Sequence, residues 1–244
     1  MTRQTMLARG GGVTVWRQIA EVMEADIVGG GLPPGSRMPT EAALSARFGV
    51  NRHTVRQALK SLVEKGLVRV TQGSGTYVEA KPLAYPIGMR TRFSEIVLDQ
   101  EREPAGRLIG HRIAAATAEV AAALHLSPDD PVVMVDSMRF ADGVPISWGY
   151  SAFPLPRFAR VPEVYAATGS ISAALAACGV PDYRRTSTHI GATIADRIDA
   201  ERLEMGLGRP ILVMEAVNVD PDGVPIQWGR SHFSADRVRI TVGS

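Results

Sequence analysis

The chain has 244 residues, of which 45% are hydrophobic, 21% charged and 6% aromatic, a composition typical of a soluble globular protein of one or two domains. Its formal net charge of +2 excludes a polybasic tail or a wholly basic nucleic-acid coat. Residues 1–80 nevertheless carry ten Lys and Arg against six Asp and Glu, a net charge of +4, whereas residues 81–244 are net −2. A polyanionic partner is therefore to be sought for the first third of the chain.

The single cysteine, Cys178, excludes an intrachain disulfide and a zinc site built from clustered cysteines. No stretch approaches the ~18–20 uninterrupted apolar residues of a membrane helix, and residues 1–12 lack the apolar core of a signal peptide. We expect a cytoplasmic protein with a flexible tail over residues 1–12, no cofactor, no metal site and no membrane contact.

Residues 13–79 have the pattern of three short helices followed by a hairpin. Apolar residues at helical spacing predict the first helix between Val15 and Ile27. Residues that favour helix ends then delimit a second and a third helix: Thr40, Gly49, Asn51, Lys65 and Gly66. Strands over 67–71 and 76–78 are joined through glycines that permit a tight turn.

The third helix carries a cationic face opposite its apolar stripe, formed by Arg52, His53, Arg56 and Lys60. Arginine suits bidentate contacts to guanine edges and to phosphates. The alternative interpretation is an ordinary solvated helix face. The order of helix, capped helix, capped basic helix and glycine-tipped hairpin favours a winged helix-turn-helix, which places one helix in the major groove of DNA.

A proline-bracketed segment follows. Pro82 and Pro86 restrict the backbone around them, so we expect a semi-rigid linker over 79–90 and a second domain over 91–244.

The second domain contains an internal repeat. The run Asp-Gly-Val-Pro-Ile-x-Trp-Gly-x-Ser occurs at 142–151 and again at 222–231, and each copy follows an apolar strand that begins after a proline. Helical segments over 117–126 and 196–207 precede those strands. This pattern predicts an α+β domain in which two related halves share one antiparallel sheet.

The run Thr91-Arg92-Phe93-Ser94 lies just before a helical stretch. Hydroxyls, first-turn N–H groups and a guanidinium that converge in this way would bind an anion. The alternative interpretation is a plain helix cap beside a solvent-exposed arginine.

Four segments of the first domain resemble the DNA-binding domain of GntR-type bacterial transcription regulators: 33–41, 48–59, 64–68 and 72–78. The resemblance implies contacts to bases and phosphates from Asn51, Arg52, His53, Thr54 and Arg56. It also implies that Gly73 lets the wing tip approach the minor groove. Ala42 departs from the pattern, because many relatives carry a DNA-contacting arginine there.

The repeat and the run 139–145 resemble the effector (UTRA) domain of the HutC subfamily, whose fold is shared with chorismate lyase. Shorter motifs resemble the phosphonate-metabolism regulators within that subfamily: the run 50–54, Tyr85-Pro86, the runs 91–95 and 98–100, and Arg184-Arg185. The resemblance implies that Arg139 and Ser170 bind a phosphate group and that Tyr150 and Arg230 select the organic part of the effector. Ser137 replaces a second arginine of sugar-phosphate sensors, which favours a phosphonate, a phosphate ester or free phosphate.

Together these features predict a homodimeric transcription regulator, a repressor, that reads palindromic operator DNA and responds to a small anionic effector. No common catalytic motif occurs in the sequence, so we expect no enzymatic activity. Three alternatives remain at this point: a chorismate-lyase-like enzyme with an attached DNA-binding segment, a regulator of a different ligand such as a sugar phosphate, and a constitutive DNA-binding protein whose second domain only dimerises.

Overall fold

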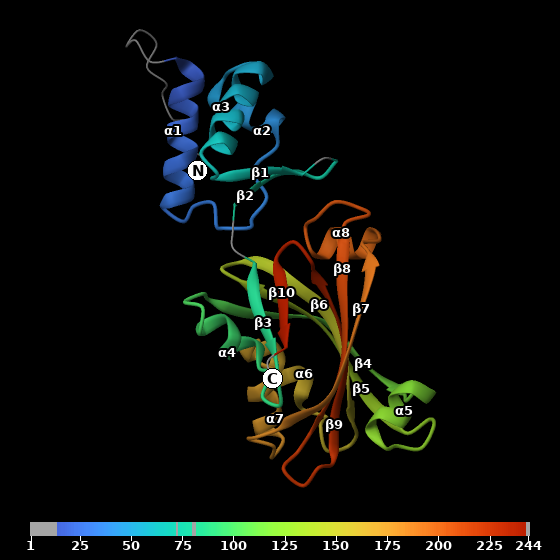
Figure 1. Cartoon of the computed structure of the whole chain (residues 1–244). Helices are drawn as coiled ribbons and strands as arrows, with labels where there is room; N and C mark the ends of the chain where they lie inside the picture. The colour runs from blue at the N-terminus through green and yellow to red at the C-terminus, as the bar shows by residue number, and fades with distance from the viewer. Residues whose placement is uncertain (1–13, 72, 80–81, 243–244) are drawn as a thin grey trace. The chain divides into compact units, whose positions relative to one another are not determined.

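The computed structural model describes residues 14–71, 73–79 and 82–242 (Figure 1). The chain divides into two compact units, residues 1–81 and 82–244, each with its own core. The tail expected over residues 1–12 lies outside the described residues.

The first unit consists of three helices and a hairpin, as the sequence predicts: α1 (Val15–Val28), α2 (Glu41–Phe48), α3 (Arg52–Glu64), β1 (Val68–Thr71) and β2 (Gly75–Val78). The side chain of Thr40 accepts a hydrogen bond from the backbone N–H of Ala43 at 3.2 Å, and that of Asn51 accepts one from Thr54 at 2.9 Å. Both helices therefore begin at the predicted caps.

The apolar stripes of all three helices form the core of the first unit. α3 buries Val55, Leu59 and Leu62 against α1 and α2 and leaves the cationic side of the helix outside. With the β1–β2 hairpin following α3, the unit is a winged helix-turn-helix.

The second unit is built on a six-stranded antiparallel sheet with the order β4-β5-β6-β9-β8-β7. Its strands are β4 (Pro104–Ala115), β5 (Pro131–Ala141), β6 (Val144–Pro154), β7 (Arg184–Ile194), β8 (Pro210–Val219) and β9 (Pro225–Ser234). The two halves predicted from the repeat meet at the centre, where β6 pairs with β9 and Tyr150 lies opposite Arg230. Tyr150 and Arg230, which are equivalent positions of the repeat, thus lie at the point about which the two halves are related.

Helices cover both faces of the sheet (Figure 1). α5 (Ala118–Leu124) and α8 (Arg197–Arg202) each follow an edge strand, and both contact the face that carries Trp148 and Trp228. The opposite face packs against α4 (Phe93–Leu98), α6 (Val161–Thr168) and α7 (Ile171–Ala177), together with a short parallel pair of strands. Side chains alternate between the two environments because the strand period is two.

That parallel pair differs from the expected linker over 79–90. Residues Leu83–Ile87 form strand β3, which pairs with β10 (Val238–Val242) in the second unit. Leu83 and Tyr85 are buried, and the Tyr85 ring lies 5.1 Å from that of Phe233. The burial of these alternate side chains outweighs the restrictions imposed by the flanking prolines, so the segment is a strand of the second unit rather than a connection.

None of the helices within the described ranges has both the length and the apolar character needed to cross a bilayer.

Candidate functional site

The first candidate surface is the exposed side of α3. Arg52, His53 and Arg56 are exposed there, whereas Asn51 and Thr54 are hydrogen-bonded to each other at the start of the helix. Two of the five predicted α3 contacts therefore also hold the helix end in shape. Gly73 is exposed at the hairpin tip with φ +74°, a conformation that suits glycine.

Sequence reasoning missed the partner of Arg56. Its Nε lies 2.9 Å from both carboxylate oxygens of Glu41 at the start of α2. The hydrogen bond that Arg56 donates to Glu41, together with the negative charge of Glu41, raises the pKa of Arg56. The carboxylate orients the guanidinium on the outer side of the helix, so Glu41 is a positioning residue for Arg56.

The second candidate site is a cavity of about 50 Å³ in the second unit. It lies on the sheet face covered by α4, α6 and α7. Five residues predicted for an anion site line it: Thr91, Phe93, Ser94, Arg139 and Ser170. The volume exceeds the ~10–15 Å³ that a single water needs, so the cavity has room for a small anion.

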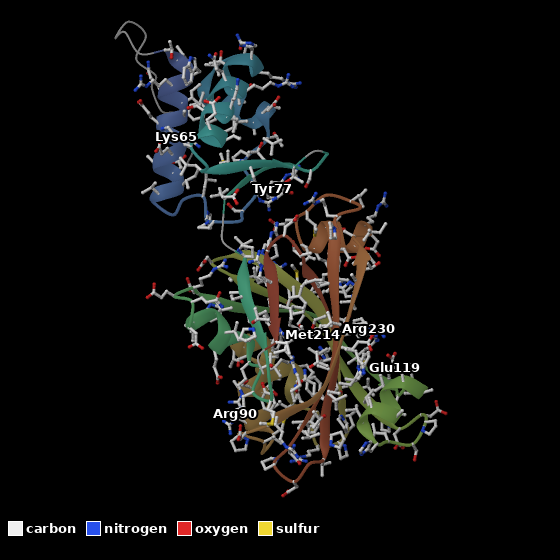
Figure 2. All side chains as sticks on the ribbon, viewed as in Figure 1. Lys65, Tyr77, Arg90, Glu119, Met214 and Arg230 are labelled. Atoms are coloured by element: carbon white, nitrogen blue, oxygen red, sulfur yellow. The ribbon has the colours of Figure 1, made fainter. Side chains whose placement is uncertain are left out.

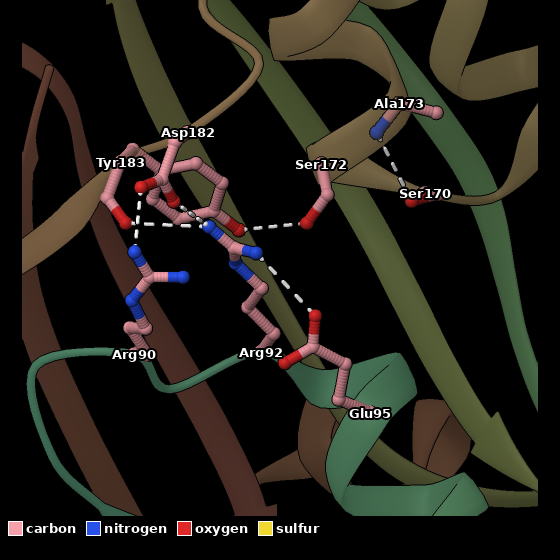
Figure 3. Close-up of polar contacts among 8 residues, drawn as sticks. All are labelled: Arg90, Arg92, Glu95, Ser170, Ser172, Ala173, Asp182 and Tyr183. Carbon is pink, nitrogen blue, oxygen red and sulfur yellow. Dashed lines mark hydrogen bonds and ion pairs between the residues drawn. The ribbon is translucent and has the colours of Figure 1, made fainter.

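Two of the lining hydroxyls are engaged in shaping the cavity wall. The Thr91 hydroxyl donates to the carbonyl of Gly88 at 2.7 Å and accepts from its N–H at 2.9 Å, which closes the turn before α4. The Ser170 hydroxyl accepts from the N–H of Ala173 at 3.2 Å and caps α7 (Figure 3). Both hydroxyls are thus held in fixed positions.

The structure places Arg92 outside this cavity. Its guanidinium lies 2.5 Å from Asp182 and 3.4 Å from Glu95, and it stacks 4.7 Å from the centre of the Tyr183 ring (Figure 3). Arg90 reaches the other oxygen of Asp182 at 2.7 Å. The hydrogen bond from Arg92, aided by the charge of Arg90, lowers the pKa of Asp182. The ion pair of Arg92 with Asp182 therefore connects the turn that contains Thr91 to the segment before β7.

Tyr150 and Arg230 are also not brought together with the other predicted effector residues. They lie on the opposite sheet face, where Arg230 contacts Glu215 at 2.6 Å, Glu119 at 2.9 Å and the Tyr150 hydroxyl at 3.1 Å (Figure 2). The reason is the two-residue period: the neighbouring Ser151 faces the cavity side, so Tyr150 faces away from it. This network ties α5 to the sheet.

Sequence reasoning missed a row of three residues on the floor of the cavity. Arg185 of β7 pairs in register with Asn218 of β8, which pairs with Gln227 of β9, so the three side chains share one face. Gln227 occupies the place that Ser147 holds in the first repeat. This difference between the two copies of the repeat was the signal in the sequence that could have identified Gln227.

Arg185 supplies the second guanidinium of the cavity. Burial lowers its pKa, and the positive charge of Arg139 lowers it further. Ser137, the position at which sugar-phosphate sensors carry their second arginine, is buried on β5. The two positive charges thus come from different halves of the domain. No Asp or Glu is among the described residues that line the cavity.

Comparison with known proteins identifies both units. Residues 16–78 match the family described as bacterial regulatory proteins, gntR family, and residues 99–239 match the UTRA domain. An uncharacterised HTH-type transcriptional regulator of Rhizobium meliloti is 42% identical over 95% of each chain. The probable transcriptional regulator PhnF of Escherichia coli is 32% identical over 85% of this chain and 86% of its own.

Among solved structures, PhnF from Mycobacterium smegmatis superposes with a TM-score of 0.64 at 26% identity, covering 93% of this chain and 98% of that one. The winged helix-turn-helix and the two-half sheet domain therefore occur together in a known regulator. This chain belongs to the GntR family of bacterial transcriptional regulators, in the HutC-type group that carries a UTRA domain.

Proposed function

We propose that this regulator is a homodimeric repressor of genes for phosphonate or phosphate-related metabolism, whose DNA binding is controlled by a small effector with a phosphate or phosphonate group. The observation that carries the proposal is the pairing of Arg139 and Arg185 in one cavity lined by hydroxyls and amides, without a carboxylate among its described lining residues. A repressor of this kind acts most simply by covering its operator.

The electrostatics of the cavity favour an anion. Neither Arg139 nor Arg185 has an ion-pair partner among the described residues, and each lies within the field of the other. Two like charges in a partly buried site repel, and removing them from water costs free energy. An anion bound between them offsets both terms through charge-assisted hydrogen bonds.

The first test is whether binding depends on ligand charge. We expect inorganic phosphate and methylphosphonate to raise the melting temperature of the full chain in proportion to ln(1 + [L]/Kd). The neutral ester dimethyl methylphosphonate, which keeps the phosphorus centre without the charge, should leave it unchanged. Equal shifts with the charged and the neutral compound, or no shift with either, would contradict the anion site.

The DNA-binding proposal is tested on α3. Arg52→Ala should weaken binding to a duplex selected from random sequence by the wild-type protein, by about 1–3 kcal/mol if Arg52 contacts a base edge. Arg160→Ala removes an equally exposed arginine from the second unit and serves as the matched control. Identical anisotropy titrations for both variants and the wild type would remove α3 as the reading helix.

We propose that the dimer forms through the two edge strands of the sheet, β4 and β7. β4 and β7 each have one strand partner, and each carries the run Ile-Gly-x-x-Ile, at 109–113 and 190–194. Ile113 is 71% exposed and Ile194 69%. Long edge strands with exposed apolar residues are sites of strand pairing or association between chains. A second copy is the partner that a palindromic operator requires.

We therefore expect the double variant Ile113→Lys/Ile194→Lys to shift the protein from dimer to monomer in light scattering coupled to size-exclusion chromatography, because charges at a buried apolar contact are costly. Leu207→Lys changes an equally exposed residue, 70% accessible, in the loop before β8, and should leave the dimer intact. A dimer that persists in the double variant at micromolar concentration would exclude these edges as the interface.

A further inference from the structure

The cavity continues inward beyond the two arginines. A second chamber of about 30 Å³ shares Tyr85, Arg139, Arg185, Asn218 and Gln227 with the first. These five residues therefore form the boundary between an outer chamber, which contains Thr91 and Ser170, and an inner chamber on the sheet itself. Both chambers are far smaller than the ~300–1,000 Å³ of sites for drug-sized ligands. The part of a molecule that lies within both chambers therefore has only a few non-hydrogen atoms beyond its anionic group.

A chain of hydrogen bonds runs from this boundary to Ser151 in the inner chamber. Asn218 Nδ2 donates to Gln227 Oε1 at 2.7 Å, and Gln227 Nε2 donates to the Ser151 hydroxyl at 3.0 Å. Asn218 is only 6% exposed, yet its Oδ1 has no hydrogen-bond partner among the described residues. A buried polar atom left unpaired is costly, and in native proteins such an atom usually marks the place of a missing partner.

Two considerations restrict which chemical group can be the partner of Asn218 Oδ1. Reversing both amides of the chain would present Asn218 Nδ2 instead of Oδ1, so the partner must suit either a donor or an acceptor. A hydroxyl does both. An ammonium group only donates, and it would add a third positive charge next to Arg139 and Arg185, with no carboxylate among the described lining residues to balance it.

We propose that the effector carries a neutral hydroxyl two or three carbons from its phosphorus group, and that Asn218 selects it. The class is the short hydroxyalkylphosphonates and the hydroxyalkyl phosphate monoesters, which share this chemistry. The inference rests on the proposed anion site: the arginines hold the phosphorus group, and the Asn218–Gln227–Ser151 chain reads the hydroxyl.

The test is calorimetric titration of the full chain with compounds of one size. 2-Hydroxyethylphosphonate should bind at least about tenfold more tightly than propylphosphonate, in which a methyl group replaces the hydroxyl, and also more tightly than 2-aminoethylphosphonate. 2-Hydroxyethyl phosphate is the ester arm, and whichever of the two hydroxylated compounds binds more tightly identifies the source of the phosphorus group.

Two variants separate recognition from folding. Asn218→Leu should reduce the preference for 2-hydroxyethylphosphonate over propylphosphonate to less than about twofold while retaining propylphosphonate binding. Asn218→Asp introduces a carboxylate beside the same chamber and should reverse the order in favour of 2-aminoethylphosphonate, a result that simple loss of packing does not produce. Equal affinity of the wild type for the hydroxyl, methyl and amino compounds overturns this inference alone. Absence of binding by every compound overturns the anion site as well.

Discussion

Arg185→Met is expected to weaken methylphosphonate binding about ten- to hundredfold while the protein remains folded. Each charge-assisted hydrogen bond removed from a partly buried site costs about 1.5–3 kcal/mol, roughly a ten- to hundredfold loss of affinity. The unliganded protein should lose no stability. Burial lowers the pKa of Arg185, its Nε has no hydrogen-bond partner in the described part of the chain, and methionine fills a similar volume without a buried charge. Calorimetry measures the affinity and thermal unfolding measures the stability.

Arg230→Met is the matched control, because Arg230 is a partly buried arginine of the same sheet on the opposite face. Its guanidinium is paired with Glu119 and Glu215, so its removal leaves two carboxylates without their counterion (Figure 2). We expect the melting temperature to fall and methylphosphonate affinity to stay within about twofold. If Arg230→Met lost affinity and Arg185→Met kept it, the effector would bind on the α5 side of the sheet.

Gly106→Ala is expected to destabilise the second unit and to weaken anion binding at the same time. A Cβ on Gly106 would lie 2.0 Å from the carbonyl oxygen of Gly169 and 2.7 Å from the Tyr165 hydroxyl. Gly106 pairs in register with Arg139, and Gly169 ends α6 just before Ser170. The close approach of these two glycines therefore brings Ser170 to the cavity that contains Arg139. Overpacking of this kind costs about 1–3 kcal/mol, a fall of several degrees in melting temperature.

Gly110→Ala, in the same strand, provides the control. No atom lies within 4 Å of the position that a Cβ would take on Gly110, and its φ is not in the left-handed region. Because Gly110 lies in the proposed edge contact, the comparison uses methylphosphonate affinity, which should match that of the wild type. If Gly106→Ala behaved in the same way, the contact between β4 and the α6–α7 turn would not position the cavity.

The first unit was predictable from the sequence because its signals are local. Thr40 and Asn51 cap helices by hydrogen bonds that span three residues, and Gly49 ends α2 with φ +65°. The spacing of Val55, Leu59 and Leu62 decides which side of α3 is buried. The central sheet was predictable for a different reason, since a repeated sequence folds twice into the same hairpin.

The cavity was predictable only in part, because its two sides come from distant segments. Thr91 and Ser94 were predicted from their place just before a helix, Arg139 and Ser170 through resemblance to a family, and all four line one space. Arg185 lies next to Arg184 in the sequence. The strand pairing is irregular between Arg185 and Ser187, so the alternation of side chains along β7 does not predict which of the two arginines faces the cavity. Arg92 has the positive charge expected of an anion ligand, but it forms an ion pair with Asp182, which lies ninety positions later in the sequence.

β3 was missed for a related reason. Prolines at both ends of Leu83-Ala84-Tyr85 read locally as a linker, whereas the segment is held by β10 at the far end of the chain. Nothing within a short window of sequence indicates that pairing.

The central claim is that an anion in the cavity of the second unit controls DNA binding by the first. The most direct measurement is fluorescence anisotropy of an operator selected from random sequence, titrated with wild-type protein and with Arg185→Met, each with and without saturating 2-hydroxyethylphosphonate. The phosphonate should shift the midpoint for the wild type by about 5–150-fold, the usual range of allosteric coupling, and leave the midpoint of the variant in place. An equal shift in both proteins, or a wild-type midpoint that does not move although calorimetry shows the phosphonate bound, would contradict the claim.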